Sequence, residues 1–173
     1  MSNPEFENIQ IIRSRKRRKT VSAQLLKGVM VVQAPARMPE KELQKTIEGF
    51  KVRFKKRRIR QEILAAEDIS KVAERLNKKY FEGKLKINSI KYVTNQNKRY
   101  GCCSCREKTI RVSHQLTKMP VWVRDYVVIH ELAHLQEPNH SKAFWEIVNR
   151  YKYTERAKGY LLAHGMMEDE ADW

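Results

Sequence analysis

The sequence predicts an α+β fold, in which a small antiparallel sheet packs beside a group of helices and a basic β-hairpin forms the N-terminal part. Three observations support this prediction. Segments rich in β-branched residues lie on both sides of residues 27–28, whose Lys-Gly pair is typical of a hairpin turn. Apolar residues recur at helical spacing in several segments, most clearly in 120–136. Residues 85–93 show the alternation of apolar and polar residues that is typical of a strand.

The N-terminal part is expected to contain the hairpin and a long helix. The strands of the hairpin are expected at residues 20–25 and 29–33. Pro39 suits the first position of a helix, which should run to about residue 60. The apolar residues that recur along this helix are Leu43, Ile47, Phe50 and Phe54.

The next elements are a second helix and three strands. Asp68 should cap the helix, which ends near Gly83. The strands are expected at residues 85–93, 99–103 and 109–112.

The C-terminal part should be helical. The helix at 120–136 ends before Pro138, because proline cannot continue a helix. Ser141 should cap a short helix that reaches about residue 151, and Thr154 should cap a last one that reaches about residue 163.

Charge is unevenly distributed along the chain. The 173 residues hold 36 Lys and Arg against 20 Asp and Glu, a formal net charge of +16. Residues 1–90 hold 23 of the basic and 10 of the acidic side chains, a net charge of +13. A field of this size attracts polyanions such as nucleic acid, and a solvated basic surface is the alternative interpretation. The candidate nucleic-acid-binding residues are Arg13, Arg15, Lys16, Arg17, Arg18, Lys55, Lys56, Arg57 and Arg58.

Cysteine content and hydropathy indicate the setting of the protein. Cys102, Cys103 and Cys105 lie within four positions, are odd in number and follow no secretory leader, so a reducing, cytoplasmic compartment is expected. No run of about 18 apolar residues could span a bilayer, so we expect no membrane insertion. Cys102 and Cys105 could form half of a structural zinc site, although packing of Cys103 in the core is the stronger interpretation.

The strongest motif is His-Glu-x-x-His at residues 130–134. His130 and His134 lie one helical turn apart on one face, where two imidazoles can bind one Zn²⁺. The residues around them are apolar on nearly all sides of the helix, which is typical of a core helix. Buried imidazoles and a buried carboxylate need partners, and a metal ion supplies them. The alternative is a pair of hydrogen-bonded core histidines beside a structural glutamate.

A catalytic zinc ion takes three protein ligands and leaves one position for water. His140 is the expected third ligand, because it follows the last histidine of the motif by six residues and lies just beyond the helix break at Pro138. Glu137 and Glu146 are alternative carboxylate ligands. Zinc is expected to lower the pKa of a water molecule, and Glu131 is expected to be the general base in peptide hydrolysis.

Two blocks, residues 125–135 and 139–145, resemble the YgjP-like metallopeptidases, a family similar in its helix motif to the SprT-like and WLM proteases. Residues 99–104 resemble the R-W-G-S-C-S strand of that family, with Tyr100 in place of tryptophan and Cys102 in place of serine. The resemblance implies zinc at the three histidines and a strand along the active-site cleft that could align an extended peptide. The substrate-binding residues that it implies are Arg99, Tyr100, Gly101, Cys102 and Cys103.

We therefore expect a zinc-dependent metallopeptidase that acts on a peptide or protein substrate. A single domain should cover residues 1–173, with a basic hairpin and helix (1–66), a zincin-like catalytic core (67–165) and an acidic tail (166–173). One alternative is a nucleic-acid-associated protease that acts on DNA-bound proteins, as SprT-like and WLM relatives do. The other is a non-catalytic binding module that keeps a metal for stability, which would have no need of Glu131.

Overall fold

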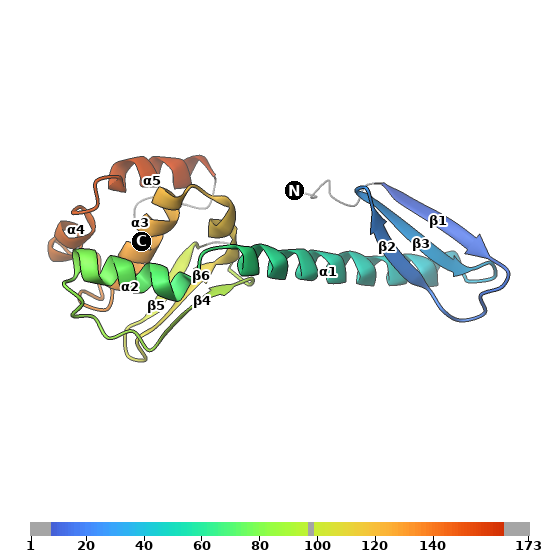
Figure 1. The fold of residues 1–173 in the computed structure, drawn as a ribbon, viewed down its shortest axis with the longest axis horizontal. Coiled ribbons are helices and arrows are strands. Elements are labelled where there is room, and N and C mark those ends of the chain that lie inside the picture. Colours follow the sequence, from blue (N-terminus) through green and yellow to red (C-terminus); the bar gives the residue numbers. More distant parts are fainter. Residues whose placement is uncertain (1–7, 97–98, 165–173) are drawn as a thin grey trace. The chain divides into compact units, whose positions relative to one another are not determined.

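The computed structural model describes residues 8–96 and 99–164, so the predicted acidic tail (166–173) lies outside the described residues. The chain divides into two compact units, Met1–Arg60 and Gln61–Trp173. Each unit has its own three-stranded sheet (Figure 1). Each also has its own cluster of buried apolar side chains. Within the described residues, five α-helices and these two sheets form an α+β fold, as the sequence predicts.

The first unit contains the predicted hairpin. β2 (Ser22–Leu26) and β3 (Val29–Pro35) pair in antiparallel fashion. Lys27 and Gly28 join them with positive φ angles of 48° and 82°. Two positive φ angles in succession are the requirement of a type I′ hairpin turn, which explains the Lys-Gly pair at this point.

A third strand, β1 (Ile9–Ser14), completes this sheet and is absent from the sequence-based prediction. It lies parallel to β3, and the strand order is β1-β3-β2. Ile9 is half-buried whereas Ile11 and Ile12 are exposed, so β1 lacks the alternation by which strands are identified. The predicted hairpin is present, but β1 was not predicted, because backbone pairing with β3 holds a strand that has no apolar pattern of its own.

Helix α1 (Glu40–Ala65) packs against this sheet through its predicted apolar face. The buried apolar cluster of the first unit consists of side chains that are each at most 1% exposed, namely Met30, Val32, Ala34, Leu43 and Ile47. Phe50 and Phe54 pack against this cluster. The helix runs about one turn beyond its predicted end, because no glycine or proline follows before Asp68.

The second unit contains the remaining elements. They are α2 (Ile69–Tyr80), β4 (Ser89–Val93), β5 (Gly101–Ser104), β6 (Thr109–Ser113), the 3₁₀ helix η2 (His114–Lys118), α3 (Val121–Ala133), α4 (Lys142–Val148) and α5 (Thr154–Ala163).

The sheet of the second unit has the order β4-β6-β5 and is mixed. β5 and β6 form an antiparallel hairpin, whereas β4 runs parallel to β6. The expectation of an antiparallel sheet was therefore wrong for β4, because this strand pairs with β6 rather than with the next strand in sequence. β6 is the central strand, and its Ile110 and Val112 side chains are fully buried.

Helix α3 is the most buried element of the second unit. All its residues from Val123 to Ala133 are buried, as the apolar pattern predicts, and it packs against α2, α4, α5, β5 and β6. It ends at Ala133, earlier than predicted, because the next backbone N–H groups, those of Leu135 and Gln136, bond in the tighter 3₁₀ pattern. No helix among the described residues is long and apolar enough to cross a membrane.

Two of the three predicted helix caps are confirmed. The Asp68 carboxylate accepts a hydrogen bond from the Ser70 N–H at 2.9 Å, and the Ser141 hydroxyl accepts one from the Phe144 N–H at 3.2 Å. The prediction for Thr154 was wrong. This residue is the first of α5, and its hydroxyl contacts two carbonyl groups of the preceding turn instead of capping the helix.

Candidate metal centre

Three histidine side chains meet at the C-terminal end of α3. His130 lies in the last turn of that helix, His134 is its C-cap residue, and His140 lies in the loop between α3 and α4. The Nε2 atom of His140 is 3.2 Å from Nε2 of His130 and 3.1 Å from Nε2 of His134. One ligand atom of each residue lies within 4.8 Å of the others. In residues 8–96 and 99–164, no other group of three His, Cys, Asp or Glu side chains comes close enough to hold a metal ion.

Local hydrogen bonds position His140. The backbone N–H of Glu137 donates to the Ala133 carbonyl at 2.8 Å, and the N–H of Ser141 donates to the Asn139 carbonyl at 2.7 Å. Ser141 then caps α4. His140 is thus the central residue of the second of two successive hydrogen-bonded turns, which bring it back to the end of α3 where the other histidines lie.

Neighbouring groups orient the histidine rings. The Nδ1 atom of His134 lies 3.3 Å from the Glu137 carbonyl oxygen, and a proton donated there leaves the Nε2 lone pair toward the other two rings. The Phe144 ring stacks on His134, with centroids 4.6 Å apart and planes inclined by 30°. The Trp145 ring stacks on His140 in the same way at 5.7 Å. Both aromatic residues belong to the block that follows the histidine motif in sequence, where core packing, or support of His140 by Trp145, is the expected role.

Burial lowers the pKa of all three imidazoles, because removal from water disfavours the charged ring. The pKa of His130 is lowered further by the two neighbouring histidines and by Lys158. The rings are therefore neutral at neutral pH, which is the form that binds metals. Three neutral imidazole nitrogens within reach of one point are a donor set that fits a divalent transition-metal ion.

Glu131 lies beside these histidines on α3 and is only 3% exposed. Burial raises the pKa of its carboxyl group to about 8, and the positive charge of Arg99 acts in the opposite direction. A carboxyl group that titrates near neutral pH can take up and release a proton under physiological conditions.

Strand β5 touches the Glu131 carboxylate at Gly101. A Cβ atom at position 101 would lie 2.2 Å from Oε1 of Glu131 and 2.7 Å from its Cδ and Cγ atoms. These distances are far shorter than any van der Waals contact, so only glycine allows the strand and the carboxylate to approach this closely. The sequence placed Gly101 near the active site, but the direct contact with Glu131 could not be anticipated from it.

The other predicted substrate-binding residues occupy different environments. Arg99 is exposed, and Cys102 is half-buried. Tyr100 is 1% exposed and packs in the core of the second unit, so only its backbone could contact a peptide. Cys103 packs against the same core, as expected, and burial raises the pKa of its thiol.

Cys105 contacts the C-terminal end of α3 and belongs to no group of possible metal ligands among the described residues. Its Sγ atom donates a hydrogen bond to the His134 carbonyl oxygen at 3.2 Å. The alternative ligands Glu137 and Glu146 do not belong to the histidine group. Glu137 contributes through its backbone carbonyl oxygen, which is the hydrogen-bond partner of His134 Nδ1.

The candidate nucleic-acid-binding residues belong to the first unit and separate into two groups. Arg13, Arg15, Lys16, Arg17 and Arg18 belong to β1 and the connection from β1 to β2. The remaining candidates lie on α1, where Lys55, Lys56 and Arg57 are exposed and Arg58 is half-buried.

Three histidines converge near a buried glutamate that lies on α3. This is the arrangement of a metal-dependent peptidase. Comparison with known families agrees with this class. The family described as "YgjP-like, metallopeptidase domain" matches residues 53–159 of the chain. The chain therefore belongs to this family. The matched segment contains α2, the second sheet, α3 with the histidine motif, and α4.

Among solved structures, the chain is similar to the crystal structure of the metallopeptidase zymogen of Pyrococcus abyssi, abylysin. The two sequences are 24% identical, the similarity covers 53% of this chain and 87% of the other, and the TM-score is 0.44. No curated protein matches the chain.

Proposed function

We propose that this protein is a zinc-dependent peptidase in which His130, His134 and His140 hold the zinc ion and Glu131 is the general base. The convergence of three imidazole nitrogens within 4.8 Å carries this proposal. A site with three protein ligands keeps a position for water or substrate, whereas structural zinc is usually enclosed by four. Membership in a metallopeptidase family supports the same class of reaction.

Each residue of the site has a distinct role in this mechanism. When bound, the zinc ion supplies a Lewis acid that polarises a peptide carbonyl group and acidifies water. Glu131 takes the proton of the attacking water on a carboxylate oxygen and passes it to the leaving amine. Its burial keeps bulk water away, and Arg99 favours the ionised form that the first of these steps requires.

We further propose that β5 aligns the substrate. In the order β4-β6-β5 it is an edge strand among the described strands, so one side of its backbone is available for pairing with an extended peptide. Gly101 of this strand touches Glu131, so a peptide paired there would pass the carboxylate. Residues 99–103 would then bind substrate mainly through their backbone.

Metal analysis combined with peptide hydrolysis tests this function. Wild-type protein and the Glu131→Gln variant should each contain about one zinc ion per chain, and His140→Ala should lose most of it. Only the wild type should cleave a mixture of fluorogenic peptides, with Glu131→Gln slower by about 10²–10⁴-fold. A protein without zinc, even after zinc is added, would contradict the metal site. Unchanged turnover in Glu131→Gln would contradict the general base and favour another residue in that role.

The setting that we propose is a reducing, cytoplasmic one. Cys102, Cys103 and Cys105 are free thiols despite lying within four positions. Free cysteines in such proximity are typical of compartments that keep thiols reduced.

A further inference from the structure

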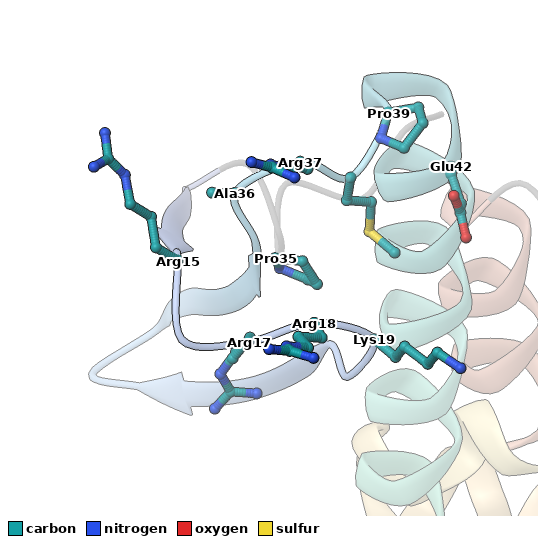
Figure 2. Close-up of a pocket in the computed structure, with 10 residues that line it drawn as sticks. Arg15, Arg17, Arg18, Lys19, Pro35, Ala36, Arg37, Pro39 and Glu42 are labelled. Carbon is teal, nitrogen blue, oxygen red and sulfur yellow. The ribbon is translucent and has the colours of Figure 1, made fainter.

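The first unit contains a strongly basic cavity of about 940 Å³ (Figure 2). It lies between the connection from β1 to β2 and the connection from β3 to α1. Of the residues that the structure describes, five cations line it, together with one carboxylate, that of Glu42. Figure 2 shows Arg17, Arg18 and Lys19 in succession along the first connection, with Arg37 across from them on the second. Arg15 is the fifth cation.

Arg13 fixes one wall of this cavity. Its Nη1 group donates hydrogen bonds to the carbonyl oxygens of Pro35 at 3.2 Å and Met38 at 2.7 Å. Its Nη2 group pairs with Glu40 at 2.6 Å. Arg13 therefore holds the connection between β3 and α1 in place.

Most of the cavity cations are available to a ligand. Arg15, Arg18, Lys19 and Arg37 are exposed, and no hydrogen bond or ion pair within the described residues engages their side chains. Arg17 differs from them, because it is half-buried and donates a hydrogen bond to the side chain of Gln33. Like charges held around one hollow repel each other, so an anion that enters it is stabilised by several of them at once.

The chemistry of the lining indicates phosphate groups. Arg15, Arg18 and Arg37 carry guanidinium groups, whose planar fork donates two parallel hydrogen bonds to a phosphate. Among residues 8–96 and 99–164, no aromatic side chain lines the cavity, so the described lining offers no surface on which a nucleic-acid base could stack. The contacts would therefore be made to a sugar-phosphate backbone, without dependence on base sequence.

From this cavity, we propose that the first unit binds the backbone of double-stranded nucleic acid. The five cations line a cavity, which the phosphate backbone of a duplex can enter. A protein surface that binds a bilayer is instead flat or convex. Lys55, Lys56 and Arg57 lie on α1 outside the cavity and are not required for this binding. The binding is independent of the proposed peptidase chemistry, because it uses no residue of the metal centre.

Fluorescence anisotropy with a labelled duplex of about 20 base pairs tests the proposal at salt concentrations from about 50 to 200 mM. The test variant of the full-length chain carries Arg15→Ala, Arg18→Ala and Arg37→Ala. The control variant carries Lys71→Ala, Lys78→Ala and Lys86→Ala, which remove the same charge from exposed positions of the second unit. Thermal unfolding of both variants confirms that they remain folded.

We expect the test variant to bind the duplex at least about 100-fold more weakly than wild type near 0.1 M salt. The reason is that each lost phosphate contact reduces the slope of log K against log salt concentration by about 0.9. The control variant should lose only a few-fold in affinity, and Glu42→Gln should bind more tightly than wild type. Equal weakening in both triple variants would overturn the proposal, since binding would then follow net charge alone. Absence of wild-type binding would overturn it as well. So would preference for a single strand of the same length or for phosphatidylserine vesicles.

Discussion

The contact between Gly101 and Glu131 predicts that Gly101→Ala strongly lowers activity while leaving the metal in place. The new Cβ atom would lie 2.2 Å from Oε1 of Glu131, and ordinary contact begins at 3.4 Å. The carboxylate or the strand must therefore move by about 1.2 Å, and a misplacement of about 1 Å costs on the order of 100-fold in rate. We expect kcat/KM for peptide hydrolysis to fall by about that factor, which corresponds to about 2.7 kcal/mol of transition-state stabilisation.

Gly159→Ala is the matched control for this substitution. Gly159 lies in α5, and no atom comes within 4 Å of a Cβ placed there. The control should keep full activity and gain about 0.5–1 kcal/mol of stability, because alanine is the better helix former. Gly101→Ala should instead lose about 1–3 kcal/mol of stability through overpacking. Zinc content should match wild type in both variants.

A double substitution separates this mechanism from general damage to the site. If Gly101→Ala acts only by displacing the base, it should cause no further loss in a Glu131→Gln background. Near wild-type turnover in Gly101→Ala would refute the reasoning, and so would loss of zinc from that variant. An additional large loss in the double variant would show that Gly101 acts through another group, such as the substrate itself.

Three further predictions follow from the structure. Ser141→Ala removes the cap of α4 next to His140, so the free energy of unfolding should fall by about 1 kcal/mol and zinc should bind more weakly in competition with a chelator. Arg124→Met leaves the buried carboxylate of Asp125 with fewer partners, and urea unfolding should show a loss of about 3 kcal/mol. Removal of zinc should lower the thermal midpoint, since saturation at about 1,000 times Kd stabilises the folded state by about 4 kcal/mol.

Each of these predictions has its own control. Ser141→Asn should retain most of the stability that Ser141→Ala loses, because asparagine also caps helices well. Arg150→Met removes an exposed cation and should change the free energy of unfolding by less than about 0.5 kcal/mol. An equally small effect of Arg124→Met would contradict the stabilising role of the buried pair of Arg124 and Asp125. His140→Ala should unfold at the same temperature with and without zinc, and a zinc-dependent shift in that variant would contradict the assigned ligand.

The parts of the site that depend on local sequence could be predicted. The spacing of His130 and His134 follows from the period of a helix, and Pro138 marks the turn that returns His140. The apolar residues around the motif predict a core helix, and α3 is buried from Val123 onward.

The parts that depend on contacts between distant segments could not be predicted. β1 is held by parallel pairing with β3, and its own isoleucines do not alternate between buried and exposed. β4 also pairs in parallel with a strand that is not its neighbour in sequence. Gly101 and Glu131 lie on different elements, and the need for glycine arises only when β5 and α3 pack together. In each case the deciding interaction is absent from the local pattern.

The three histidines lie close together in sequence, and this short separation affects how the protein folds. His130, His134 and His140 lie within ten residues of one another along the chain. Closing a loop of about ten residues takes on the order of 10–100 ns and costs little chain entropy compared with pairing distant strands. A metal ion can therefore engage these side chains before the parallel strands have found their partners. Zinc captured early would favour the helical conformation of α3, around which the second core then assembles.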